Sequence, residues 1–189
     1  MKYLIRNINE LKEEDIEFIK ETYPVRYEKA SKFISGQDYK RCILSYIVLI
    51  ELIGNFSEKD VSYNEFGKPF IKNKPYFNIS HSGEYVAVAI DDNPIGADIQ
   101  IMEEKHLKLT KIFTKEEQEY INKEDVINRF HLMWSIKEAV LKLIGKGITQ
   151  SFKDVEIIDD DSLRINSTIY KYKKEVVNNN YSFVICYQK

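Results

Sequence analysis

The hydrophobic pattern of this chain changes its period along the sequence, and this change limits the folds that the chain can adopt. Between residues 38 and 54 apolar residues recur at helical spacing. Strand-like segments rich in β-branched residues follow, at 77–80, 85–90 and 95–101. A second helical stretch, from about 125 to 144, precedes three more such segments, at 155–158, 163–172 and 181–187. A helix followed by strands, twice over, predicts an α+β protein in two halves.

Several element ends carry their own signals. Residues 11–21 have the spacing of a short surface helix, and Pro24 forces the residue before it away from helical geometry. Asp38 is the expected N-cap of the first long helix, and Gly54 its stop. The second long helix is expected to close at Gly145-Lys146-Gly147. These signals place the predicted helix boundaries.

Two of the strand-like segments are close together in the chain. Residues 85–90 and 95–101 are separated only by the turn-like Asp91-Asp92-Asn93-Pro94, so we predict that they are neighbouring strands. Residues 77–80 form an earlier strand that delivers Ser80-His81-Ser82-Gly83 into a tight connection. Further on, Thr114 and Glu117 have the spacing of a capping box.

Charge and hydropathy narrow the functional class. The formal charge of -2 argues against a general nucleic-acid binder, so any anion site must be local. The most apolar run, 42–53, is interrupted by Ser45 and Glu51 and is too short to span a membrane. The N-terminal residues lead directly into a charged segment, which predicts a cytoplasmic protein. Cys42 and Cys186 are expected to be buried thiols.

Segment 95–101 places polar residues on one strand face. The odd positions are apolar, so Asp98 and Gln100 project together from the other face. Gly96 beside them is expected to leave space for a bulky ligand. The alternative is a half-exposed strand whose polar residues simply face water.

The second long helix carries two charged residues, Glu138 and Lys142, that lie off its apolar face. They are neighbours at a spacing of four, so a surface ion pair is the alternative to a functional site. Lys137 lies nearer the apolar arc, where its stem can pack while its ammonium reaches out. Trp134 and Phe130 are expected to be core residues.

Two short segments could hold a phosphate. Gly67-Lys68-Pro69 is a turn that presents a lysine, and 80–83 clusters hydroxyls, an imidazole and a glycine. A hydrolase is disfavoured, because Ser80 and His81 are adjacent on a strand and no nucleophile-elbow sequence surrounds them.

Four motifs in this order resemble the phosphopantetheinyl transferases, most closely the type that activates surfactin synthetase. They are Gly67-Lys68-Pro69, Phe77 to Gly83, Ile95-Gly96-Ala97-Asp98-Ile99 and Trp134 to Lys142. Upstream, Pro24, Arg26, Lys29 and 38–41 are similar to the coenzyme A-binding region of that family more loosely, with Arg26 where lysine is commoner.

The resemblance implies a fold and a reaction. It implies two similar halves, 1–92 on the adenosine side and 93–189 with the metal-binding strand and helix. In each half a helix packs on a small antiparallel sheet, and the active site lies in the cleft between them. It also implies Mg²⁺-dependent transfer of 4′-phosphopantetheine from coenzyme A to a serine of an apo acyl or peptidyl carrier protein, releasing 3′,5′-adenosine bisphosphate.

Residue roles follow from the same resemblance. Asp98 and Glu138 become catalytic residues and Mg²⁺ ligands, with Gln100 as a neutral third ligand where relatives often carry glutamate. The base for the serine is either Glu138 or a water on the metal. The residues expected to bind coenzyme A are Arg26, Lys29, Arg41, Lys68, Ser80, His81 and Lys142.

The sequence also allows other functions. A binding protein of the same fold that has lost catalysis is the main alternative, although the pairing of Asp98 with Glu138 argues against it. A generic nucleotide-binding domain lacks any phosphate-loop or dinucleotide fingerprint. We expect a monomer that binds neither nucleic acid nor membrane, and the sequence does not identify the carrier protein.

Overall fold

The computed structural model describes residues 1–146 and 151–188. Gly147, the end of the predicted helix-closing turn, lies outside them. The α-helices are α1 (Glu13–Thr22), α2 (Pro24–Ser31), α3 (Gly36–Ile53), α4 (Lys115–Lys123) and α5 (Val126–Ile144). The strands are β1 (Lys2–Asn7), β2 (Val61–Tyr63), β3 (Pro69–Ile71), β4 (Tyr76–Ser82), β5 (Tyr85–Asp91), β6 (Ile95–Ile101), β7 (Val155–Ile157), β8 (Ser162–Ile165), β9 (Thr168–Val177) and β10 (Tyr181–Tyr187).

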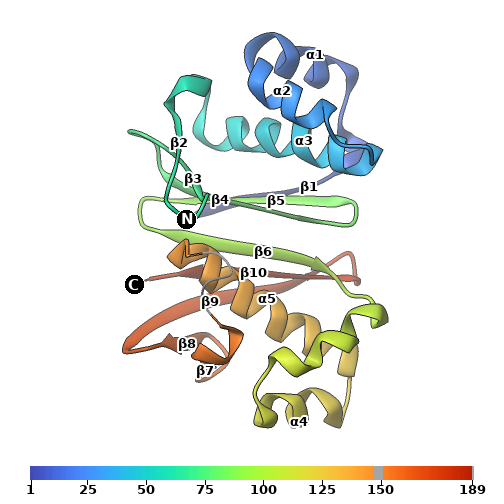
Figure 1. Cartoon of the computed structure of the whole chain (residues 1–189), viewed down its shortest axis with the longest axis vertical. Helices are drawn as coiled ribbons and strands as arrows, with labels where there is room; N and C mark the ends of the chain where they lie inside the picture. The colour runs from blue at the N-terminus through green and yellow to red at the C-terminus, as the bar shows by residue number, and fades with distance from the viewer. Residues whose placement is uncertain (147–150, 189) are drawn as a thin grey trace.

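The protein is α+β, as predicted, and its described strands form antiparallel sheets. One sheet has the order β1-β5-β4, a larger one β6-β10-β9-β8-β7, and β2 and β3 form a separate hairpin. Helix α3 packs on β5 and β1, and α5 packs on β6 and β10. The two long helices therefore lie over different sheets, α3 next to the first and α5 next to the second (Figure 1).

Apolar side chains fill the space between the two sheets. Ala87 and Ala89 of β5 meet Ile95, Ala97 and Ile99 of β6 in one buried cluster. The odd positions of β6 thus face the core between the sheets, as their alternation predicts. The even positions of β6 face the side of the strand that α5 covers.

The predictions for β5 and β6 were correct in extent but wrong in pairing. Strand β6 begins and ends at the predicted residues, yet β5 pairs with β1 and β4 while β6 pairs with β10. The short segment 91–94 is therefore no hairpin turn, and it carries the chain from one sheet to the other. Two helix details also differ. The N-cap of α3 is Ser35 in place of Asp38, and Pro24 begins a helix as its N1 residue.

Side chains of β4 join the two sheets along the edge of β6. The backbone N–H groups of Ala97, Ile99 and Ile101 donate to Asn78 Oδ1, Ser80 Oγ and Ser82 Oγ at 2.9, 3.1 and 3.0 Å. Unpaired backbone N–H groups at the edge of a buried strand cost folding free energy, and every second side chain of β4 accepts a hydrogen bond from one of them. The ladder fixes Ser80 beside Asp98.

Gly96 does not leave space for a ligand, which corrects the prediction from the sequence. A Cβ at this position would collide with the Ala139 carbonyl oxygen and would lie 2.5 Å from the Leu143 nitrogen. The glycine instead lets the backbone of α5 approach β6 closely. This close approach brings Glu138 and Lys142 over the strand that carries Asp98.

We expect Gly96→Ala to destabilise the fold by about 1–3 kcal/mol, because α5 must move away from β6 to admit the methyl group. The measurement is the urea midpoint of unfolding. Gly36→Ala is the matched control, since Gly36 begins α3 with open space around its Cβ position. Equal midpoints for the two variants would contradict the close packing at Gly96.

The ammonium of Lys137 does not reach out, which is a second correction. The side chain is fully buried, and Nζ donates to the carbonyls of Phe152 and Val155 at 2.8 and 2.7 Å. It also forms an ion pair with Glu117 at 2.6 Å. Helix α4 and the start of β7 cover this side of α5, so Lys137 ties three elements together.

Other predictions are confirmed. Cys42 and Cys186 are buried free thiols, Phe130 lies in the core, and Thr114 and Glu117 form the predicted capping box. Within the described ranges, no helix combines the length and the apolar character needed to cross a membrane.

Candidate functional site

Asp98 is the centre of the candidate site. Its side chain is only 4% exposed, so it is not the water-facing residue of the alternative reading. Its Oδ1 accepts hydrogen bonds from Lys142 Nζ at 2.6 Å and from Ser80 Oγ at 3.1 Å. Its Oδ2 is buried and has no partner among the described residues. Burying a carboxylate oxygen costs folding free energy unless a cation or a hydrogen-bond donor binds it.

Ser80 links Asp98 to Lys142. Its hydroxyl donates to Asp98 and accepts from Lys142 Nζ at 2.9 Å and from the Ile99 N–H. The hydroxyl is thus occupied within the protein, and its predicted contact with phosphate stays a prediction. Lys142 forms its ion pair with Asp98 and, within the described residues, none with Glu138, so the surface pair of Glu138 and Lys142 predicted as the alternative does not form.

Glu138 lies half-buried on α5 next to these groups. Burial, and then the negative charge of Asp98, raise the pKa of Glu138, while Lys142 opposes them. The two carboxyl groups are therefore close enough to repel each other electrostatically. Two neighbouring carboxylates with one unpaired oxygen suit a hard cation such as Mg²⁺.

Gln100 is half-buried on the same face of β6 as Asp98. Its side-chain amide makes no hydrogen bond within residues 1–146 and 151–188, so it is available to a ligand. The described part of the chain holds no cluster of three or more His, Cys, Asp or Glu side chains suited to a metal. A cation here would therefore rest on two carboxylates, on neutral oxygens such as that of Gln100, and on the ligand.

His81 and Arg41 lie on the first sheet and on α3. Burial of the ring, and then the positive charges of Arg41 and Lys142, lower the pKa of His81, although part of its side chain stays exposed. Arg41 forms an ion pair with Asp38 at 2.6 Å and donates to the Gly83 carbonyl at 2.5 Å. Its Nε is buried and unpartnered within the described structure. The positive charges of Arg41 and Lys142 beside the ring favour an anion there, whereas the burial of the ring does not.

Arg26 and Lys29 line a separate cavity of about 570 Å³, together with Tyr46 and Lys59. Arg26 donates to the Cys42 carbonyl at 3.0 Å and its guanidinium lies 4.3 Å from the centre of the Tyr46 ring. It is therefore held firmly against α3 with one face toward the cavity. The structure does not bring Arg26 and Lys29 into direct contact with Asp98.

Lys68 lies at the end of α5. Its Nζ donates to the carbonyls of Leu143 and Ile95 at 3.1 and 3.2 Å, and burial lowers its pKa to about 8. The neighbouring Asn64 donates to the Gly145 carbonyl at 2.9 Å. The loop between β2 and β3 thus caps the helix that carries Glu138. The predicted contact of Lys68 with the nucleotide stays a prediction.

Sequence reasoning missed a polar cavity of about 650 Å³ that includes Gln100 and Arg41. Gln37, Asn178 and Asn180 also line it. Distant parts of the chain supply these amides, and only folding brings them together. The sequence signal at 178–180 is no more than that of a turn.

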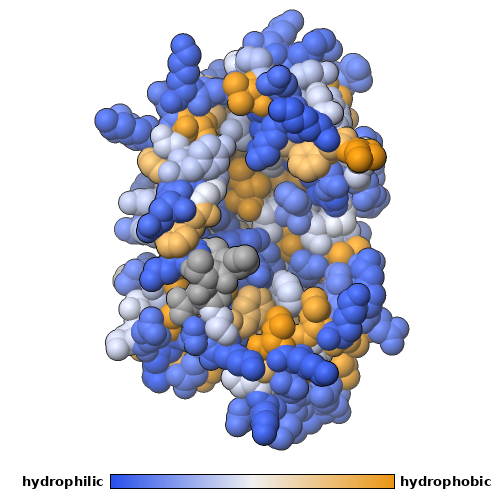
Figure 2. Space-filling view, in the orientation of Figure 1, coloured by the Kyte–Doolittle hydropathy of each residue, from blue (hydrophilic) through white to orange (hydrophobic). Residues whose placement is uncertain are grey.

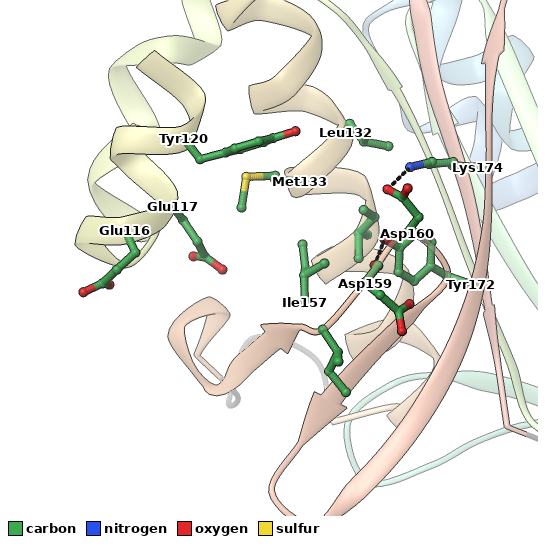
Figure 3. A pocket seen from close by; sticks show the side chains of 12 residues that line it. Glu116, Glu117, Tyr120, Leu132, Met133, Ile157, Asp159, Asp160, Tyr172 and Lys174 are labelled. Carbon is green, nitrogen blue, oxygen red and sulfur yellow. Dashed lines mark hydrogen bonds and ion pairs between the residues drawn. The ribbon is translucent and has the colours of Figure 1, made fainter. Parts of the chain in front are cut away.

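Another cavity, of about 500 Å³, lies between α4, α5 and the β7–β9 region (Figure 3). Leu132, Met133 and Ile157 supply apolar lining, and Glu116 and Asp159 add carboxylates to it. None of the predicted site residues lines it in the described structure. The surface seen in Figure 2 is mostly hydrophilic, with apolar residues in small groups.

Comparison with known proteins identifies similar sequences. Residues 94–186 match the model of the 4′-phosphopantetheinyl transferase superfamily. The chain is 32% identical over 155 residues to 4′-phosphopantetheinyl transferase gsp of Aneurinibacillus migulanus, covering 76% of this chain and 63% of that protein. It is 32% identical over 148 residues to 4′-phosphopantetheinyl transferase Sfp of Bacillus subtilis strain 168, covering 72% and 66%.

A third relative, a 4′-phosphopantetheinyl transferase of Bacillus subtilis, is 30% identical over 152 residues, which are 73% of this chain and 67% of that protein. The chain thus matches about two thirds of the length of these curated relatives, and slightly less for the first two. The matched family segment contains Asp98, Gln100, Glu138 and Lys142.

Proposed function

Because the chain belongs to the 4′-phosphopantetheinyl transferase superfamily, we propose that it transfers 4′-phosphopantetheine from coenzyme A to a serine of an apo carrier protein. The single observation that carries this function is the buried Asp98, whose Oδ2 has no partner among the described residues, together with the half-buried Glu138 and the adjacent Lys142. Carboxylates and a lysine side by side suit a ligand that carries both a metal and phosphate.

The proposed active site lies in a cleft between two halves, residues 1–92 and 93–189. Strand β5 ends at Asp91 and β6 begins at Ile95 in another sheet, which supports a boundary between them. The candidate residues come from both sides, with Ser80 from β4 and Asp98 from β6. Packing of the two sheets would then be required for activity.

The residues present fit Mg²⁺. Asp98 Oδ2, the carboxylate of Glu138 and the amide oxygen of Gln100 would hold it, because all are oxygen donors on one side of β6. When bound, Mg²⁺ would offset the charge of the pyrophosphate and so favour departure of the bisphosphate. Lys142, already held by Asp98 and Ser80, is placed to donate to the same pyrophosphate.

Glu138 is the proposed base. Its raised pKa makes it a stronger proton acceptor than an ordinary carboxylate. The carrier serine oxygen would bond to the β-phosphorus as its proton passes to Glu138. The bond from that phosphorus to the bridging oxygen breaks, and 3′,5′-adenosine bisphosphate leaves.

The basic residues of the first half would bind the nucleotide. His81, Arg41 and Arg26 share an electrostatic neighbourhood, since the positive charges of both arginines lower the pKa of His81. Lys29 and Lys68 would line the nucleotide region, as the family resemblance implies. Charge-assisted bonds from such groups position phosphates.

The test is direct. The protein is incubated with coenzyme A, Mg²⁺ and a panel of apo acyl and peptidyl carriers, and mass spectrometry is used to detect carriers with added phosphopantetheine. Transfer to at least one carrier is expected. Binding of coenzyme A without transfer to any carrier would favour the alternative, a non-catalytic binding protein of this fold.

We expect Gln100→Glu to lower the Mg²⁺ concentration needed for half-maximal transfer, with a smaller change in the rate at saturation. The added carboxylate gives the site a negative charge that the neutral amide lacks. The measurement is a Mg²⁺ titration at fixed coenzyme A and carrier. Superimposable titration curves for wild type and variant would show that Gln100 does not face the metal.

A further inference from the structure

We propose that the cavity of about 500 Å³ between α4, α5 and the β7–β9 region is a separate ligand site, and that it takes a small organic ammonium ion with an apolar body (Figure 3). Sites for small molecules commonly have volumes of about 300–1,000 Å³. In the described structure, none of the residues assigned to catalysis, to the metal or to coenzyme A lines this cavity. The inference therefore goes beyond the proposed function and does not depend on it.

The apolar body of the ligand would lie on a surface supplied by α5 and the second sheet. Met133 and Ile136, three residues apart on one face of α5, are both buried. Leu132 and Ile157 also line the cavity and are half-buried, and Tyr172 of β9 is buried. Water against such side chains has few partners for hydrogen bonds, so an apolar group that displaces it gains free energy.

Tyr120 of α4 supplies an aromatic wall that is already held in position. Its hydroxyl end points from α4 toward Leu132 across the cavity (Figure 3). Arg129 donates to the Tyr120 carbonyl at 2.8 Å, and its guanidinium lies 4.4 Å from the centre of the ring. Arg129 is itself paired with Glu124, so its charge is offset. The remaining surface of the ring can pack against a ligand at little cost in side-chain entropy.

The charges around the cavity select a cation. Its lining includes one ammonium and four carboxylates, which belong to Lys174, Glu116, Glu117, Asp159 and Asp160. Glu117 and Asp160 are paired, with Lys137 at 2.6 Å and with Lys174 at 3.3 Å. Within the described residues, the other two carboxylates form no ion pair. The cavity therefore keeps an excess of negative charge, which attracts a cation and repels an anion.

The two unpaired carboxylates come from opposite sides of the cavity. Hydrogen bonds from the Ser162 side chain and the Asp161 backbone lower the pKa of Asp159 to about 2, so this group is ionised at neutral pH. The Tyr172 hydroxyl donates to the Asp159 carbonyl at 2.8 Å and holds this turn against β9. Glu116 lies in the first turn of α4 and points outward from it (Figure 3). An ammonium in the cavity would thus lie between negative charges on α4 and on the turn after β7.

The experiment uses three indoles of similar size that differ chiefly in charge: tryptamine carries an ammonium, tryptophol a hydroxyl and indole-3-acetate a carboxylate. The full chain is labelled with ¹³C in the methyl groups of its three methionines, Met1, Met102 and Met133. Of these, only Met133 lines the cavity, so the other two signals are internal controls. We expect tryptamine to shift the Met133 signal with an affinity roughly two- to tenfold higher than that of tryptophol, the range of one or two exposed charge pairs. Indole-3-acetate should leave the signal unchanged.

A double variant tests the source of this preference. Glu116→Gln with Asp159→Asn keeps the shapes of the side chains but removes both unpaired carboxylates. The affinity for tryptamine should fall to about that for tryptophol, and the affinity for tryptophol should stay the same. Glu28→Gln with Asp92→Asn is the matched control, because it removes two exposed carboxylates outside the cavity and changes the net charge equally.

The outcomes separate this inference from the proposed function. Binding of tryptamine at Met133 that weakens in the cavity variant and not in the control variant supports the inference. No shift of Met133 with tryptamine, equal affinities for tryptamine and tryptophol, or an equal loss in both double variants would each overturn it. A shift of Met133 with the peptide N-acetyl-leucyl-lysyl-leucinamide but not with tryptamine would overturn it in favour of a peptide. Transfer from coenzyme A to a carrier is measured independently, so either proposal can fail while the other stands.

Discussion

Asp98→Asn is expected to reduce transfer to an apo-carrier by about 10²–10³-fold, comparable to loss of one key electrostatic group in an active site. Asparagine keeps an oxygen that can accept from Ser80 and Lys142, so the local hydrogen bonds need not collapse. It removes the negative charge and replaces one carboxylate oxygen by a donor. A cation next to Oδ2 would lose its strongest ligand.

Glu138→Gln should give a similar loss, because it removes both a ligand and the proposed base. The measurement is the initial rate of carrier modification at saturating Mg²⁺, with thermal unfolding as a check on the fold. Asp160→Asn is the control, since Asp160 is a fully exposed carboxylate paired with Lys174. Wild-type turnover in either Asp98→Asn or Glu138→Gln would refute the assignment of the site.

The sequence predicted the elements that carry the site because their periods are regular. Strand β6 was bounded correctly, since strict alternation separates a core face from a polar face. The alternation also placed Asp98 and Gln100 together. Their role came from the order of four motifs, since a single polar strand face has many explanations.

Contacts between elements were not predictable in the same way. The short segment after Asp91 has the composition of a hairpin turn, yet it leads to another sheet, where β6 pairs with β10. Ser80 binds Asp98 only because β4 lies against the edge of β6. Gly96 was correctly predicted to be a point of close approach to the backbone of β6, but the group that approaches is α5 and not a ligand. Such outcomes depend on the packing of distant segments, which local patterns do not encode.

Lys137 shows the same limit on the scale of one side chain. Its position near the apolar arc of α5 predicts a buried stem. The pattern of α5 alone gives no sign that α4 would supply Glu117, or that carbonyls of Phe152 and Val155 would meet the ammonium. Burial lowers the pKa of Lys137, and Glu117 opposes that effect. The lysine is therefore a structural charge whose removal should be costly.

We expect Lys137→Met to lower the free energy of unfolding by about 3–5 kcal/mol, because it leaves the mostly buried Glu117 carboxylate without its cation. Methionine retains much of the length of the side chain, so the loss would come chiefly from the charge and its hydrogen bonds. Urea unfolding gives the measurement. Lys174→Met is the control and should change stability by at most about 1 kcal/mol, as expected for one partner of an exposed ion pair.

A second variant separates the effect of the uncompensated charge from that of the lost hydrogen bonds. Adding Glu117→Gln to Lys137→Met removes the unpaired carboxylate, while glutamine can still serve the capping box with Thr114. The double variant should therefore be more stable than Lys137→Met alone, since the buried charge is the main penalty. If Lys137→Met proved no more destabilising than Lys174→Met, the ammonium would contribute little to holding α4 and β7 against α5. If the double variant were no more stable than the single one, the penalty would lie in the lost hydrogen bonds to Phe152 and Val155 and not in the charge of Glu117.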